Sequence, residues 1–131
     1  KIIKRKIEIG ELYYESLKKY PYLQLPKKTK DVVNVFWLFT VIVKSLDKKE
    51  MLSVMSKLQG LGIETRPIFY PMHQQPIYYN ESRKESDFPV SNWFAERGIS
   101  LPSSSKLTDP EISYICSEFI EVLETIIKKK S

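Results

Sequence analysis

Apolar and polar residues divide the first third of the chain into a helix and a strand. Residues 1–19 place apolar side chains at helical spacing, and Tyr20-Pro21 ends this pattern because the residue before a proline disfavours the helical conformation. Residues 21–31 form a polar connector. Residues 32–43 are β-branched or aromatic almost throughout, which predicts a long strand covered on both faces along much of its length.

The next segments predict a second helix and a returning strand. Asp47 and Glu50 have the spacing of a capping box, and the apolar residues of 48–60 keep to one helical face. Gly62 offers a left-handed position that ends the helix. We expect an extended return that starts at Ile63 and lies beside the first strand.

The last part of the chain predicts a short helix, a short strand and a long helix. After the polar residues 80–87, the short helix covers 90–97 and the strand covers 99–102. Thr108 and Glu111 form a second capping box before a broad apolar stripe. The order of elements predicts an α+β fold of two layers, in which helices pack on a small antiparallel or mixed sheet.

Length and composition limit the functions open to the chain. A length of 131 residues fits a single domain, residues 1–131, which can bury a core without help from disulfides or metal ions. The net charge is +5, but the basic residues form short groups at ends and turns, which is typical of solvated surface rather than of a nucleic-acid groove. No apolar run approaches the roughly 20 residues of a membrane span. We expect a cytoplasmic protein that binds neither nucleic acid nor membranes.

The single cysteine and single histidine exclude an internal disulfide and leave no cluster for a structural zinc ion. Cys116 falls on the apolar face of the last helix and is expected to be a small core residue. The chain starts without methionine, and its first helix starts without a capping residue. We therefore expect a fragment of a longer protein.

Residues 62–79 carry the candidate chemistry. Three prolines stiffen this stretch and keep it out of a helix or a central strand. Its Arg66, Phe69, Tyr70 and His73 supply a guanidinium, aromatic faces and an imidazole, which suit a ligand with anionic, planar and hydroxylated parts. The alternative is a proline-rich surface loop whose aromatic residues pack into a core.

This stretch and the segments after it resemble a known family. The motifs that carry the resemblance are, in order, Arg66-Pro67-Ile68-Phe69-Tyr70-Pro71-Met72-His73, Phe88-Pro89-Val90, Arg97-Gly98-Ile99-Ser100-Leu101-Pro102 and Leu107-Thr108. Together they are similar to the C-terminal part of the DegT/DnrJ/EryC1/StrS sugar aminotransferases. The first motif is nearest to the GDP-perosamine synthase branch.

The resemblance implies the small domain of a fold-type-I, pyridoxal-phosphate-dependent transferase, with residues 1–19 as a truncated interdomain helix. Such enzymes move an amino group, usually from glutamate, to a nucleotide-linked keto-sugar. The family's Schiff-base lysine and cofactor ligands belong to the large domain, and no lysine here stands in a matching motif. The resemblance thus implies pyridoxal phosphate in the parent but none on this chain alone. It also implies no catalytic or metal-binding residue here, and the chain's own large domain and a homodimer mate as partners.

By the same resemblance, Arg66, Phe69, Tyr70 and His73 are the candidate substrate-binding residues. Arg66 would approach an anionic or hydroxylated part of the ligand, while Tyr70 and His73 would bind sugar or phosphate oxygens. A structural ion pair for Arg66 and packing of the loop for the other residues are the alternatives. The rival function is a free-standing α+β binding or regulatory module, and a basic nucleic-acid-binding domain is a weaker third.

Overall fold

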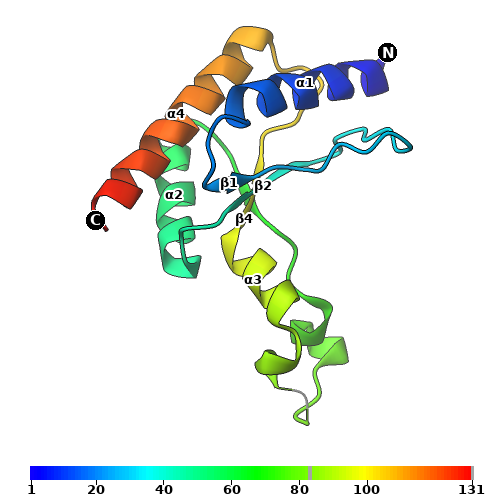
Figure 1. The fold of residues 1–131 in the computed structure, drawn as a ribbon, viewed down its shortest axis with the longest axis vertical. Helices are drawn as coiled ribbons and strands as arrows, with labels where there is room; N and C mark the ends of the chain where they lie inside the picture. The colour runs from blue at the N-terminus through cyan, green and yellow to red at the C-terminus, as the bar shows by residue number, and fades with distance from the viewer. Residues whose placement is uncertain (83, 131) are drawn as a thin grey trace.

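The computed structural model describes residues 1–82 and 84–130, with a four-stranded sheet at its centre (Figure 1). The strands are β1 (Leu23–Gln24), β2 (Phe39–Val43), β3 (Arg66–Pro67) and β4 (Gly98–Leu101), and they lie in the order β1-β2-β4-β3. The α-helices are α1 (Ile2–Leu17), α2 (Lys48–Gly60), α3 (Pro89–Arg97) and α4 (Asp109–Lys128). All three strand pairings are antiparallel, so the predicted α+β fold is confirmed in its antiparallel form.

The main core lies between the sheet and the helices α1, α2 and α4. Tyr13 of α1 is fully buried, its ring stacks on Phe39 at 4.9 Å, and its hydroxyl donates a hydrogen bond to the Pro102 carbonyl at 2.7 Å. Cys116 of α4 belongs to the same core, as the sequence predicts. The strand residues that complete this core are Leu23, Phe39, Val41, Val43, Ile99 and Leu101.

Both predicted capping boxes are confirmed. At the start of α2, Asp47 Oδ1 accepts a hydrogen bond from the Glu50 amide at 2.9 Å, and Glu50 Oε2 accepts one from the Asp47 amide at 2.8 Å. Thr108 and Glu111 make the equivalent pair at the start of α4. Each box satisfies amide donors that the first turn of a helix leaves without partners.

Residues 32–38 are not part of a strand, so the prediction of one long strand over 32–43 is wrong. Phe36 has φ 47°, a left-handed conformation that interrupts extended backbone, and its amide donates to Asn34 Oδ1 at 2.8 Å. Within the described chain, no strand pairs with these residues, and Val33 is 77% exposed. The apolar pattern therefore marks a projecting segment, residues 26–38, which we call the arm (Figure 1).

The base of the arm is fastened to α1. The Phe36 ring is buried directly against Gly10, where an added Cβ would lie 2.2 Å from a ring atom. Lys6 donates to the carbonyls of Trp37 and Ser103, at 2.8 and 2.6 Å. These contacts leave little freedom at the point where the arm enters β2.

The return strand β3 lies beside β4, not beside β2 as predicted. Both β2 and β3 run antiparallel to β4, so α2 acts as a crossover between two strands of the same direction. The fully buried β4 takes the place between them. Pro67 lacks an amide donor, which suits the sheet edge. The predicted connector, residues 21–31, also contains the short strand β1, which the sequence analysis missed.

Residues 68–88 extend away from the helical layer and return through α3 (Figure 1). They contain three 3-10 turns, η1 (Met72–Gln74), η2 (Pro76–Tyr78) and η3 (Glu85–Asp87). The Asn92 amide group connects two of them: its Nδ2 donates to the Glu85 carbonyl at 2.7 Å, and its Oδ1 accepts from Gln74 Nε2 at 3.1 Å.

Candidate functional site

Arg66 lies on the edge strand β3 with its guanidinium in solvent. Its nearest charge partner is Glu64, at 3.5 Å, and these side chains are 75% and 80% exposed. An ion pair this exposed contributes little to stability. The guanidinium is therefore free to bind an anion in a bidentate manner.

Phe69 also points into solvent, where it meets Trp37 at the base of the arm. Their ring centroids are 6.2 Å apart with an interplanar angle of 25°, and the side chains are 69% (Trp37) and 70% (Phe69) exposed. Trp37 was expected inside a buried strand, so the sequence analysis missed this pair. The exposed pair of Trp37 and Phe69 could be predicted only by knowing that the strand β2 starts at Phe39.

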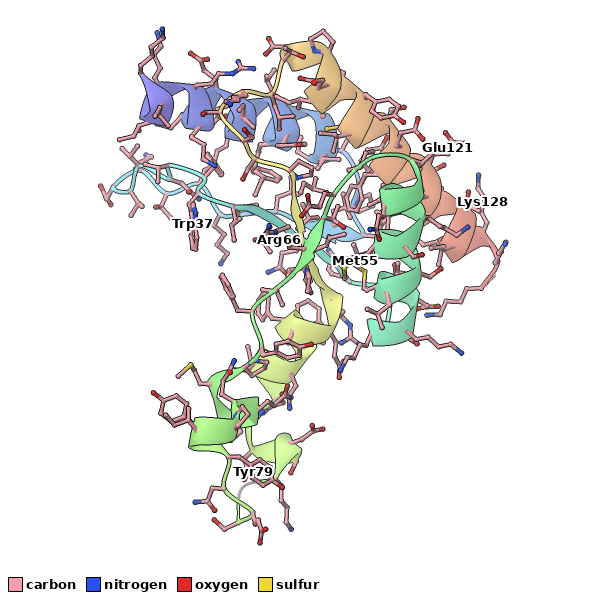
Figure 2. All side chains as sticks on the ribbon, turned by 180° about the vertical axis from the view of Figure 1, so that it is seen from behind. Trp37, Met55, Arg66, Tyr79, Glu121 and Lys128 are labelled. Atoms are coloured by element: carbon pink, nitrogen blue, oxygen red, sulfur yellow. The ribbon has the colours of Figure 1, made fainter. Side chains whose placement is uncertain are left out.

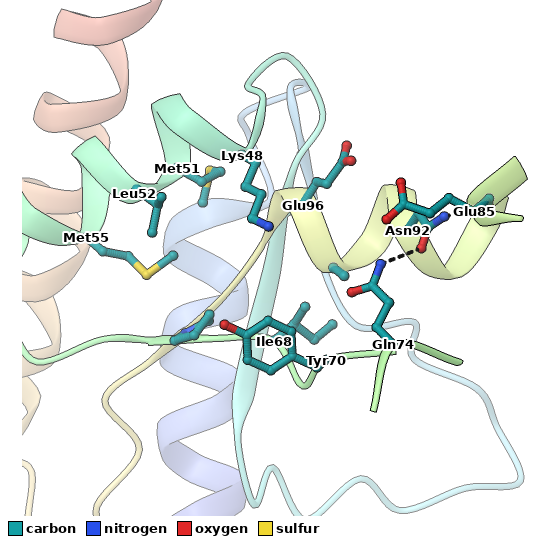
Figure 3. Close-up of a pocket in the computed structure, with 12 residues that line it drawn as sticks. Lys48, Met51, Leu52, Met55, Ile68, Tyr70, Gln74, Glu85, Asn92 and Glu96 are labelled. Carbon is teal, nitrogen blue, oxygen red and sulfur yellow. Dashed lines mark hydrogen bonds between the residues drawn. The ribbon is translucent and has the colours of Figure 1, made fainter. Parts of the chain in front are cut away.

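Tyr70 lines a groove of about 210 Å³ between α2 and α3 (Figure 3). Its ring lies across from Met55, while Lys48 reaches toward the groove from the first turn of α2. Gln74 and Asn92 close the other end through their hydrogen bond. The groove thus combines an apolar wall with a cation, amide groups and the carboxylates of Glu85 and Glu96.

His73 stacks on Phe88, with ring centroids 4.2 Å apart and an interplanar angle of 14°. Its Nε2 is buried and has no hydrogen-bond partner among the described residues. The ring lines a separate depression together with Tyr78 and Ser91. Within the described chain, the four predicted residues lie in different surroundings, and their role in substrate binding stays a prediction.

Lys6 does not fit an anchor for pyridoxal phosphate. A lysine that forms a Schiff base needs a neutral amine free to attack a carbonyl group. Lys6 is the described lysine whose pKa is lowered, and burial is the cause. Its ammonium group is held by three oxygen acceptors, the carbonyls of Trp37 and Ser103 and the Ser103 hydroxyl. Lys6 is thus a structural cation.

Metal and membrane sites were also searched for in residues 1–82 and 84–130. No group of three or more histidine, cysteine, aspartate or glutamate side chains there could hold a metal ion. No helix in these residues has both the length and the apolar character needed to cross a membrane.

Comparison with known families supplies the decisive observation. The model of the DegT/DnrJ/EryC1/StrS aminotransferase family matches residues 1–120. The chain belongs to this family. The resemblance carried by the motifs around Arg66 is thereby confirmed.

The curated relatives include two GDP-perosamine synthases. The protein from Escherichia coli O157:H7 is 34% identical over 119 residues, which cover 91% of this chain and 31% of the relative. The protein from Vibrio cholerae is 36% identical over 117 residues, covering 89% and 31%. The chain therefore spans about a third of the length of these relatives.

Solved structures share the fold over most of the chain. The apo form of the putative sugar aminotransferase Spr1654 from Streptococcus pneumoniae superposes with a TM-score of 0.89 at 23% identity, covering 98% of this chain and 32% of that one. DesV from S. venezuelae, solved with a ketimine intermediate, gives a TM-score of 0.79 at 27% identity, covering 91% and 31%. The antiparallel sheet packed by helices is thus a recurrent part of sugar aminotransferases.

Proposed function

We propose that this chain is the substrate-covering, C-terminal domain of a pyridoxal-phosphate-dependent aminotransferase that acts on a nucleotide-linked keto-sugar. The family match over residues 1–120 carries the proposal. The GDP-perosamine synthases among its relatives favour an amino-sugar product and a GDP-linked substrate. In this proposal glutamate is the amino donor, and α1 is the end of the helix that joins the large domain.

The exposed apolar side chains of residues 69–79 support a covering role. Six of them are exposed: Phe69, Tyr70, Met72, Ile77, Tyr78 and Tyr79. Contiguous apolar surface beyond a few hundred Å² usually marks an interaction site. We infer that the large domain and a second subunit cover this surface in the parent enzyme.

The proposal assigns binding and positioning, but no chemical step, to this chain. Pyridoxal phosphate would supply the electron sink for transamination, held by the large domain. Arg66 would bind an anionic group of the substrate through its free guanidinium. Tyr70 and His73 would border the mouth of the site, since both lie on the segment that follows β3.

The central experiment compares the full-length parent with the 131-residue chain. Each is mixed with pyridoxal phosphate, glutamate and a GDP-linked keto-sugar, and the amino-sugar product is measured by mass spectrometry. We expect product from the parent alone, and no saturable aldimine absorbance from the isolated chain. Stoichiometric aldimine and turnover by the isolated chain would refute the domain assignment. A parent without transaminase activity would favour the binding-module alternative.

The role of Arg66 is tested in the parent by Arg66→Ala, with Glu64→Ala as the matched control. Loss of a charged hydrogen bond costs roughly 1.5–3 kcal/mol, so KM for the nucleotide-sugar should rise about ten- to a hundredfold. Glu64→Ala removes the same ion pair but keeps the guanidinium, and should leave KM nearly unchanged. Equal effects of both variants on stability and cofactor affinity would identify a structural ion pair instead.

A further inference from the structure

Trp37 and Phe69 form an exposed aromatic pair, of which the predicted site includes only Phe69. Tryptophan is usually largely buried, yet the Trp37 side chain is 69% exposed and its ring contacts Phe69. We propose that these two rings are the platform on which the base of the nucleotide-sugar stacks, with Arg66 as the contact for its phosphates. This inference rests on the proposed function and adds Trp37 to its substrate-binding residues.

Hydrogen bonds fix the backbone of Trp37, while its ring stays exposed to solvent. Its carbonyl accepts hydrogen bonds from Lys6 at 2.8 Å and from the Ser103 hydroxyl at 2.9 Å. The preceding residue, Phe36, is buried against Gly10. A fixed backbone with an exposed ring loses little conformational freedom when a planar ligand stacks on it.

Phe69 approaches from a different element. It follows Pro67 and Ile68, and the Ile68 amide donates to the Gly98 carbonyl at 3.4 Å, which continues the edge of the sheet. The next proline, Pro71, is buried. Two segments far apart in sequence thus bring one ring each to the same place, as expected for a binding platform rather than for local loop packing.

The positive charge of Arg66 indicates which class of ligand would bind. Arg66 precedes Phe69 by three residues, about 10 Å of extended chain, and its guanidinium faces solvent. Figure 2 shows Trp37 at the base of the arm and Arg66 on the edge strand. Stacking tolerates any base, and a guanidinium binds phosphate oxygens in pairs. An exposed ring pair and an exposed guanidinium three residues along the chain supply the two kinds of contact, stacking and phosphate binding, that a nucleoside diphosphate needs.

Intrinsic fluorescence provides a direct test, because the chain has two tryptophans, Trp37 and Trp93. Trp93 is half-buried, with Phe94 at 5.1 Å and Arg97 over its ring at 5.5 Å. The full-length Trp93→Phe variant is compared with the Trp93→Phe, Trp37→Phe double variant, and the difference in their fluorescence isolates Trp37 from any tryptophan in the rest of the parent. GDP should quench this Trp37 signal saturably. Ribose 5-phosphate should not. Absence of quenching, or equal quenching by ribose 5-phosphate, would overturn the inference.

Kinetics of the full-length parent separate a stacking role from a structural one. Trp37→Ala should raise KM for the nucleotide-sugar about tenfold with little change in kcat, and Trp37→Phe, which keeps a ring, should restore most of this loss. Val33→Ala, an exposed apolar change on the same arm, is the control and should leave KM unchanged. Lost stability at unchanged KM would show that Trp37 packs against another part of the protein.

The two proposals fail in different ways. If the parent turns over the nucleotide-sugar but Trp37 variants bind it normally, the platform is refuted and the function stands. If no keto-sugar is transaminated but GDP still quenches Trp37, the aminotransferase proposal is refuted and the nucleotide platform stands.

Discussion

The contact between Gly10 and Phe36 predicts that the effect of Gly10→Ala on the free energy of unfolding changes sign when the Phe36 ring is removed. In an exposed helix interior, Gly→Ala stabilises by about 1 kcal/mol through helix propensity. At Gly10 the new Cβ would lie 2.2 Å from Phe36 Cδ2 and 2.3 Å from Cγ, so the buried ring must leave its place. Exposing a phenylalanine forfeits roughly 1.5–3 kcal/mol. We expect Gly10→Ala to lower the free energy of unfolding by about 0.5–2 kcal/mol.

In a Phe36→Ala background the obstacle is gone, so the same change should raise the free energy of unfolding by up to about 1 kcal/mol. Urea unfolding of the four proteins of this double-mutant cycle, followed by far-ultraviolet circular dichroism, measures the coupling. Gly60→Ala is the control, because nothing lies within 4 Å of its added Cβ. A stabilising Gly10→Ala in the otherwise unchanged chain would refute the anchoring of the arm.

Three further outcomes are expected. Thr108→Ala should cost about 1 kcal/mol in urea unfolding through the lost cap. Hydrogen bonds from Thr108 lower the pKa of Glu111. The stabilisation by the cap is therefore present above the ordinary pKa of the carboxyl group and is lost as the pH falls through the lowered pKa. A cap whose contribution to stability grows in acid would contradict the assignment. Burial raises the pKa of Cys116 to about 11, so a thiol reagent should label the native chain far more slowly than the urea-unfolded chain at neutral pH. Asn92→Ala removes the contacts to Gln74 and Glu85 and should speed proteolytic cleavage within residues 72–88, whereas equal rates would show that the bridge does not hold this segment.

The candidate site was predicted in part. Arg66 and the proline-rich segment were predicted from the chemistry of consecutive residues. The family match over residues 1–120 confirmed the resemblance that they carry, and their role in binding stays a prediction. Their surroundings were not predictable from that segment. Phe69 contacts Trp37, and His73 contacts Phe88, through the way distant parts of the chain fold together.

Local sequence patterns specify the helices, and for α2 and α4 they also specify the first residue. The capping boxes at Asp47 and Thr108 and the apolar stripes behind them act within a few residues, so local chemistry suffices. It also determined the strand β4, whose apolar run stops at Pro102. These elements were enough to predict an α+β domain.

Strand pairing, by contrast, depends on contacts between distant parts of the chain. Residues 32–38 have the composition of a strand, but no strand among residues 1–82 and 84–130 pairs with them. Phe36 adopts a left-handed conformation and buries its ring against α1. The place of β3 beside β4 depends on the α2 crossover. Backbone hydrogen bonds of a sheet join residues far apart in sequence, so strand order and the exposure of Trp37 follow from the assembled core rather than from any local pattern.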